Sequence, residues 1–230
     1  MINLRKTFYI FTIIFFVISC KQKTKEYKLK KKAQNENSGV QNITVCKKQF
    51  KNGIEFETCI SDYNSFTLKN LKGEILYKNN NNPSEFKFID FNEDGFLDIV
   101  LYFITNTPSV NEILIFHPES KCFIEIENFS NFPASKKIKK TNYYYSYKRN
   151  GCADSNWISD LFYFEKNKAV KIGNIFTVEC NNENENGIFF YKVTGENKKQ
   201  IEFISIDKKP FESKWKFIEK YWTENYEKFK

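Results

Sequence analysis

The feature that most constrains this chain is a repeated alternation of residue types. From residue 41 onward, short runs rich in Ile, Val, Phe, Tyr and Thr are separated by clusters of Asn, Lys, Gly and Ser, at a spacing of roughly a dozen residues. Some runs alternate strictly, as in Ile54-Glu55-Phe56-Glu57, which buries one face of a strand. The pattern predicts a mainly β fold, with strands at 43–50, 54–60, 65–68, 74–78, 85–89, 97–104, 112–117, 123–128, 137–148, 159–165, 169–178, 187–193 and 200–206. We expect residues 41–230 to form a single antiparallel β-sandwich or propeller-like domain.

Two stretches depart from this alternation. The run 97–104 is apolar apart from Asp98, which suits a central strand covered on both faces. After Pro210, apolar residues recur every three or four positions and predict a C-terminal amphipathic helix, at Phe211, Trp215, Ile218, Trp222 and Tyr226. This aromatic stripe could dock a ligand, but at helical spacing we assign it to packing.

The N-terminus has the order of a secretory signal peptide. Arg5 and Lys6 precede an apolar run at 8–18, which is too short to serve as a permanent membrane span. The segment Val17-Ile18-Ser19-Cys20 resembles the lipobox of bacterial lipoproteins, in which the cysteine at the cleavage point is acylated. We therefore expect residues 1–19 to be removed and Cys20 to carry the lipid anchor. The alternative is a leader that is cut nearby, with Cys20 incidental.

The charge of the chain is concentrated near this leader. The whole sequence has a net charge of +8, but residues 21–40 hold seven lysines against Glu26 and Glu36, and residues 41–230 retain only +1. A nucleic-acid-binding domain would place its positive charge on a folded face, so we expect no nucleic acid partner. Residues 20–40 instead predict a lysine-rich tether, whose charges can also contact anionic lipid headgroups. Lys21 is not acidic, and by resemblance to enterobacterial sorting we expect the outer membrane, facing the periplasm.

Five cysteines follow Cys20 in the sequence. An exported chain meets an oxidising compartment, so disulfides are expected. Cys46 and Cys59 flank a turn at 51–53, and a hairpin there would bring them within bonding distance. Cys152 and Cys180 form our second predicted pair, which leaves Cys122 as a buried free thiol. The sequence contains no Cys-x-x-Cys and no cluster of Cys with His, so it has no recognisable zinc site.

Residues 90–98 have the ligand spacing of a calcium loop. Oxygen-bearing side chains occupy positions 1, 3, 5 and 9, with Gly95 at position 6 and the backbone carbonyl of Phe96 at position 7; the side chains are Asp90, Asn92, Asp94 and Asp98. Position 12 is Leu101 where a helical EF-hand has a bidentate glutamate, and strand-like runs stand on both sides. We expect a structural calcium ion; the alternative is a solvated turn held by Asx hydrogen bonds.

The loop resembles the Asp-x-Asp/Asn-x-Asp-Gly-x-x-Asp loops of FG-GAP and VCBS-type repeats, here in a single copy. With its flanking strands over 85–179, it is similar to a family of small bacterial envelope proteins that includes periplasmic lysozyme inhibitors and immunity proteins against cell-wall hydrolases. This resemblance implies a tyrosine-bearing loop that plugs a glycosidase cleft. The run that fits is Tyr143, Tyr144, Tyr145, Tyr147, Lys148 and Arg149. Its alternative interpretation is half-buried sheet packing.

Signals for catalysis are weak in this sequence. His117 is the single histidine, so a serine or cysteine triad would depend on it. No nucleophile elbow, phosphate-binding glycine loop or dinucleotide fingerprint is present. We therefore predict a binder of a protein or glycan, for example an inhibitor of a cell-wall hydrolase, and not an enzyme. The alternative is an envelope hydrolase that uses paired carboxylates among Asp154, Asp160 and Glu165, near Trp157.

Overall fold

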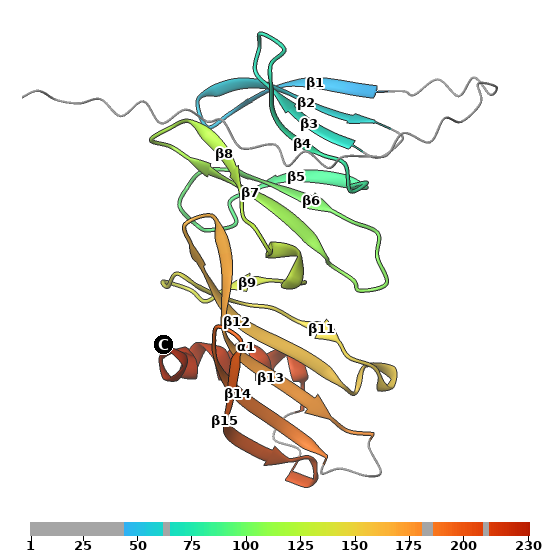
Figure 1. The fold of residues 1–230 in the computed structure, drawn as a ribbon, viewed down its shortest axis with the longest axis vertical. Coiled ribbons are helices and arrows are strands. Elements are labelled where there is room, and N and C mark those ends of the chain that lie inside the picture. The colour runs from blue at the N-terminus through green and yellow to red at the C-terminus, as the bar shows by residue number, and fades with distance from the viewer. Residues whose placement is uncertain (1–43, 62–64, 181–185, 209–211) are drawn as a thin grey trace, which may run out of the picture.

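The computed structural model describes residues 44–61, 65–180, 186–208 and 212–230 (Figure 1). The predicted signal peptide, Cys20 and the tether lie outside these residues. The described chain is mainly antiparallel β structure with one C-terminal α-helix, so the predicted fold class is confirmed. No helix within the described ranges is long and apolar enough to cross a bilayer.

The strands form three sheets that follow one another along the chain. The first sheet has the order β1-β2-β3-β4, with β1 Thr44–Lys51, β2 Ile54–Ser61, β3 Ser65–Lys69 and β4 Ile75–Asn79. The second has the order β5-β6-β7-β8, with β5 Glu85–Ile89, β6 Asp98–Tyr102, β7 Asn111–His117 and β8 Cys122–Glu125. Both are simple meanders, because each strand pairs with the next one in sequence.

The third sheet is larger, with seven strands in the order β15-β14-β13-β12-β10-β9 and with β11 also paired to β12. Its strands are β9 Lys136–Lys137, β10 Tyr143–Tyr145, β11 Lys148–Arg149, β12 Trp157–Glu165, β13 Lys168–Val178, β14 Gly187–Thr194 and β15 Asn197–Ser205. The helical elements are α1 Lys214–Asn225 and the short 3-10 turns η1 Phe129–Asn131, η2 Cys152–Asp154, η3 Ile206–Lys208 and η4 Tyr226–Phe229. The single strand predicted at 137–148 is thus divided among β9, β10 and β11.

The three sheets stack face to face in chain order, and α1 covers the far side of the third sheet (Figure 1). Strand β6 lies at the centre of this stack, as the apolar run predicted. Ile99 and Leu101 point into the core shared with the first sheet, while Val100 points into the core shared with the third. This alternation shows why β6 is apolar at successive positions, since both of its faces are covered.

Helix α1 docks through part of the predicted stripe. Ile218 and Trp222 are 1% and 0% exposed, and the indole Nε1 of Trp222 donates to Ser159 Oγ at 2.8 Å. Trp215 is 51% exposed, so its assignment to the core is wrong. It lies in the first turn of the helix, where its ring contacts Tyr147. Phe211 lies outside the described residues.

Two disulfides join the pairs that the sequence predicted. Cys46 and Cys59 face each other across β1 and β2, with Cα atoms 4.0 Å apart. Asn52 and Gly53 between these strands both have positive φ, 52° and 71°, as a type I′ hairpin turn requires. Cys152 and Cys180 are also bonded, with Cα atoms 6.3 Å apart. Cys122 is disulfide-bonded too, so the expectation of a free thiol there is wrong.

Candidate functional site

The loop between β5 and β6 is closed by its own oxygen-bearing side chains. The carboxylate of Asp90 accepts the backbone N–H of Asp94 and of Gly95, each at 3.0 Å. Asn92 Oδ1 also accepts the N–H of Asp94, at 3.2 Å, and Asp94 Oδ1 accepts the N–H of Phe96 at 2.9 Å. Gly95 has a φ of 91°, which glycine adopts without the strain of a Cβ atom. The side chains at positions 1, 3 and 5 therefore surround one tight turn.

Asp98 occupies the base of this loop and is fully buried. Its two carboxylate oxygens accept the backbone N–H of Phe91 at 3.0 Å and of Phe116 at 2.9 Å. Burial raises the pKa of this carboxyl to about 6, against the opposing effect of these hydrogen bonds. Asp98 thereby fixes both ends of the loop to β7, the strand beside β6.

The same loop also contacts residues from the first and third sheets. The side-chain amide of Asn52, in the β1–β2 turn, exchanges two hydrogen bonds of 2.8 Å with the backbone of Leu97. From β9 of the third sheet, the Lys137 ammonium donates to the carbonyl of Asn92 and lies 3.8 Å from the Glu93 carboxylate. Sequence analysis missed both Asn52 and Lys137, because each lies 45 residues from its partner and no local pattern connects them.

Two aromatic residues of the loop enter different cores. The ring of Phe91 stacks on Tyr144 of the third sheet, with centroids 5.3 Å apart and planes within 9°. The ring of Phe96 packs on Phe116 in the core shared with the first sheet, with centroids 5.6 Å apart. Together with the polar contacts, these rings make residues 90–98 the junction of all three sheets.

The loop carries ligand types that calcium prefers, although its carboxylates do not form a compact group of three ligand atoms within the described residues. Asp90, Asn92, Asp94 and Asp98 supply hard oxygen ligands, and a carboxylate oxygen that accepts one N–H keeps a lone pair for a cation. Within the described ranges, a compact group of three His, Cys, Asp or Glu ligand atoms occurs at Cys46, Glu57 and Cys59. That group is no metal site, because its two sulfurs are bonded to each other.

A second candidate site is an open pocket of about 200 Å³ beside the N-terminus of α1, which we call the Trp215 pocket. Its lining residues come from four separate segments and are Pro108, Ser109, Ala134, Tyr147, Lys148, Arg149, Asp154 and Trp215. The rings of Tyr147 and Trp215 meet with centroids 4.1 Å apart. The side chain of Arg149 is 62% exposed, so most of its donors face solvent. Three of the residues predicted to contact a partner therefore line this pocket.

Asp154 holds the wall of the pocket together. Its carboxylate accepts from the Lys214 ammonium at 2.5 Å and from the Tyr147 hydroxyl, and lies 3.7 Å from Arg149 Nε. Burial alone would raise the pKa of this carboxyl, but the hydrogen bonds from Lys214 and Tyr147 and the nearby positive charges lower it below its ordinary value. The ionised carboxylate thus ties α1 to η2.

The backbone around Asp154 is strained. Three successive non-glycine residues have positive φ, with 53° at Cys152, 48° at Ala153 and 74° at Asp154. Such conformations persist where surrounding contacts impose them, and they concentrate at functional sites. Here the Cys152–Cys180 disulfide and the ion pair to Lys214 supply that constraint.

The remaining tyrosines of the predicted binding run belong largely to the cores. Tyr144 and Tyr145 are 3% and 7% exposed and point to opposite faces of the third sheet, toward the second sheet and toward α1. Their predicted role as direct partner contacts is therefore wrong, and the packing interpretation applies. Tyr143 is half-buried and meets the ring of Tyr226 at 5.3 Å.

The carboxylates of the alternative hydrolase hypothesis do not converge. Asp154 is paired with Lys214, whereas Asp160 is buried and lies 3.3 Å from Lys171. Glu165 is exposed at the far end of β12, five residues from Asp160, so the two side chains point to opposite faces of the sheet. His117 ends β7, with no catalytic partner among the residues that the structure describes.

Comparisons with known proteins identify neither a family nor a function for this chain. No family model matches the chain, and no curated protein matches it. One solved structure is similar, described as the structure of a Xanthomonas type IV secretion system related protein. The two are 13% identical, the match covers 73% of this chain and 84% of that chain, and the TM-score is 0.42. A likeness of this degree supports no conclusion about function.

Proposed function

We propose that this protein is a lipid-anchored protein of the bacterial envelope whose β domain, stabilised by calcium, binds a protein or glycan partner without catalysis. The proposed partner is a cell-wall hydrolase, which the domain inhibits. The observation that carries the binding part is the Trp215 pocket, where an exposed indole, an exposed guanidinium and a tyrosine ring meet beside a strained turn. Trp, Tyr and Arg are the residue types that dominate binding energy at protein interfaces.

The position of the 90–98 loop supports calcium as a structural ion. Because the loop contacts all three sheets, a cation held by its oxygens would stabilise the whole stack and not one hairpin alone. Asp90, Asn92, Asp94 and Asp98 would hold the ion, together with the backbone carbonyl of Phe96. With at most three carboxylates and no bidentate glutamate, the affinity would suit extracytoplasmic calcium concentrations.

Cys20→Ser tests the anchor. We expect the variant to lose fatty-acid labelling and to move from the membrane fraction to the soluble fraction, because the lysine-rich segment alone cannot replace several acyl chains. Metabolic labelling with a fatty acid and membrane fractionation measure both effects. Continued labelling of the Cys20→Ser protein would show that the leader does not end in a lipidation site.

Inhibition is tested by mixing the mature protein with lysozymes and with cell-wall hydrolases encoded beside its gene. We expect one of these enzymes to be inhibited and the inhibition constant to rise at least about tenfold in Trp215→Ala or Arg149→Ala, as for interface hot spots. Leu71→Ala, which removes a similarly exposed apolar side chain from the turn between β3 and β4, is the matched control. Inhibition that is equally strong in the Trp215 and Leu71 variants would place the binding surface elsewhere.

A further inference from the structure

Within the ranges that the structure describes, the third sheet has one face under α1 and one face that is only partly covered. Trp157, Ile175 and Phe190 point toward α1 and are 1%, 0% and 0% exposed. Their strand neighbours Phe176 and Phe189 point the other way and are half-buried. Among the described residues, the second sheet covers this other face near β10 and near the β12–β13 turn, through Tyr144, Phe162 and Ala169. Strands β13 to β15 extend beyond it (Figure 1), and we call their side away from α1 the open face.

Strand register arranges the open face into two rows. Directly opposed residues of antiparallel strands share one face, so each row crosses several strands. One row is apolar and aromatic, consisting of Ile158, Phe176, Phe189 and Phe203. The adjacent row is polar, consisting of Asp160, Asn174, Tyr191 and Gln200. The rings of Phe189 and Phe203 lie 4.9 Å apart, and no residue of the aromatic row belongs to a core among the described residues.

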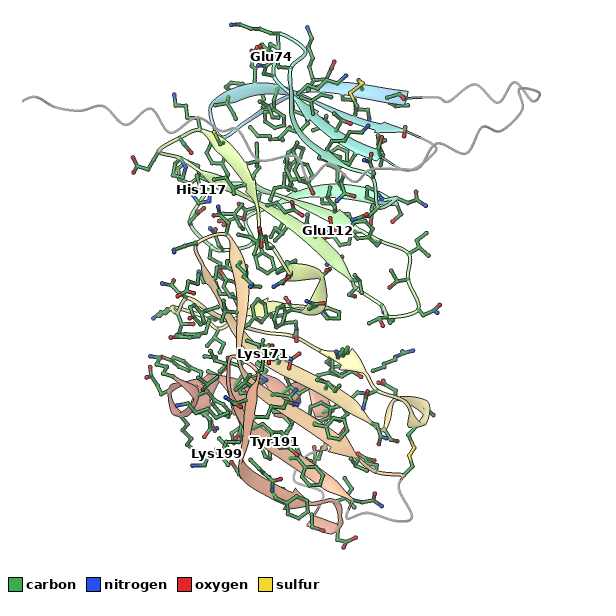
Figure 2. The ribbon with its side chains drawn as sticks, viewed as in Figure 1. Glu74, Glu112, His117, Lys171, Tyr191 and Lys199 are labelled. Atoms are coloured by element: carbon green, nitrogen blue, oxygen red, sulfur yellow. A yellow bond between two sulfur atoms is a disulfide. The ribbon has the colours of Figure 1, made fainter. Side chains whose placement is uncertain are left out.

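Lysines gather around the polar row. The Lys171 ammonium lies 3.3 Å from Asp160 Oδ1, and the Lys198 ammonium lies 5.0 Å from the centroid of the Tyr191 ring (Figure 2 marks Lys171 and Tyr191). Burial lowers the pKa of Lys198 below its ordinary value, and the positive charges of Lys171 and Lys148 lower it further, against the opposing effect of Asp160. These three cations therefore lie close enough to repel one another.

The carboxylates nearby do not balance this charge. Asp160 is one carboxylate against three ammonium groups, and it also accepts the side-chain N–H of Asn174 at 2.8 Å. Glu202 of β15 turns to the other face, where it accepts from the Tyr221 hydroxyl at 2.9 Å. Asn174 and Asp160 are 3% and 2% exposed, so they form the floor of the polar row and the lysine side chains are its accessible groups. The ammonium groups around the polar row thus outnumber its one carboxylate.

We propose that the open face binds an anionic glycan, with sugar rings packed on the row of Phe176 and Phe189 and with carboxylate or phosphate groups paired to Lys171 and Lys198. Aromatic side chains supply a flat apolar surface at low entropic cost, and the charged row beside them complements an acidic substituent on each ring. The choice of a glycan over a nucleic acid rests on the proposed export of the chain, which the Cys20 experiment tests separately.

The test is calorimetric titration of the full mature protein in detergent with an oligogalacturonate, which presents a carboxylate on every sugar. We expect binding that weakens as salt is added. The affinity should fall at least about tenfold in the Lys171→Ala/Lys198→Ala double variant and in Phe189→Ala. Lys199→Ala is the matched control, because Lys199 follows Lys198 on β15 and points to the opposite face, opposite Lys192. Its affinity should not change.

Three results would overturn the proposal. The first is the absence of binding to oligogalacturonate, and the second is equally tight binding of a neutral malto-oligosaccharide. The third is a loss of affinity in Lys199→Ala as large as the loss in the lysine double variant. Tighter binding of polyglutamate or oligo-dT, with the same dependence on Lys171 and Lys198, would assign the face to an acidic peptide or a single-stranded nucleic acid instead. If Phe189→Ala does not fold, the lysine double variant keeps the test decisive, because both side chains are at least partly exposed.

Discussion

Replacing Trp222 with alanine is expected to lower the free energy of unfolding by about 3–5 kcal/mol. The side chain is fully buried between α1 and the third sheet, packs on Phe229 with centroids 5.0 Å apart, and donates to Ser159. Gly173 permits this close approach, since a Cβ atom there would lie 3.0 Å from the Trp222 ring. Truncation would leave a cavity and remove the hydrogen bond to Ser159 Oγ, which would keep its own hydrogen bond to the Ser146 carbonyl.

Chemical denaturation of the mature protein measures this loss. Trp215→Ala is the matched control, because it removes the same side chain from the same helix at a position that is 51% exposed. We expect the control to lose less than about 1 kcal/mol. Similar losses in the two variants would mean that α1 does not dock on the sheet through Trp222.

Asp98→Ala is expected to lower the free energy of unfolding by about 2–4 kcal/mol, even with a chelator present to exclude calcium. The substitution removes the acceptor of two backbone N–H groups, those of Phe91 and Phe116, and the second of these is buried. Losing them would free the 90–98 loop from β7 and weaken its contacts with the first and third sheets. The effect should therefore exceed that of a change confined to an exposed turn.

Asp98→Asn removes the negative charge of the side chain but keeps part of its hydrogen bonding. It retains one acceptor oxygen, and we expect it to lose about half as much stability as Asp98→Ala in the same denaturant titration. A chelator-treated Asp98→Ala protein as stable as the wild type would contradict the structural role of this carboxylate.

Much of the fold could be predicted because its signals are local. Strands such as β2 and β5 follow from residue alternation, and the Cys46–Cys59 pair follows from a hairpin whose turn residues can be recognised in the sequence. The apolar run around Ile99 indicated a strand covered on both faces. The break of 137–148 into short strands was missed, because the polar spacing that divides them, at Lys139 to Asn142, resembles exposed strand positions.

The assembly of the sheets was not predictable by the same reasoning. Periodicity tells which side of a strand is buried but not which sheet covers it, so the contacts of Asn52 and Lys137 with the loop had no sequence signal. The exposure of Trp215 depends on where α1 begins relative to the sheet edge, which helical spacing alone does not give. The Trp215 pocket was therefore anticipated only through Tyr147, Lys148 and Arg149.

We propose above that residues 90–98 hold calcium at the junction of the three sheets. The most direct measurement is thermal unfolding of the mature protein with calcium and with chelator, in the wild type, in Asp94→Ala and in Glu93→Ala, which removes a carboxylate from the same loop at a position without a predicted ligand role. At a calcium concentration a hundredfold above the dissociation constant, binding should add about 2.7 kcal/mol to the free energy of unfolding. The midpoint of thermal unfolding should then rise by about 5–10 °C. We predict this shift in the wild type and in Glu93→Ala, and its loss in Asp94→Ala. A midpoint that neither calcium nor chelator changes in the wild type would contradict the account and identify the loop as an ordinary turn.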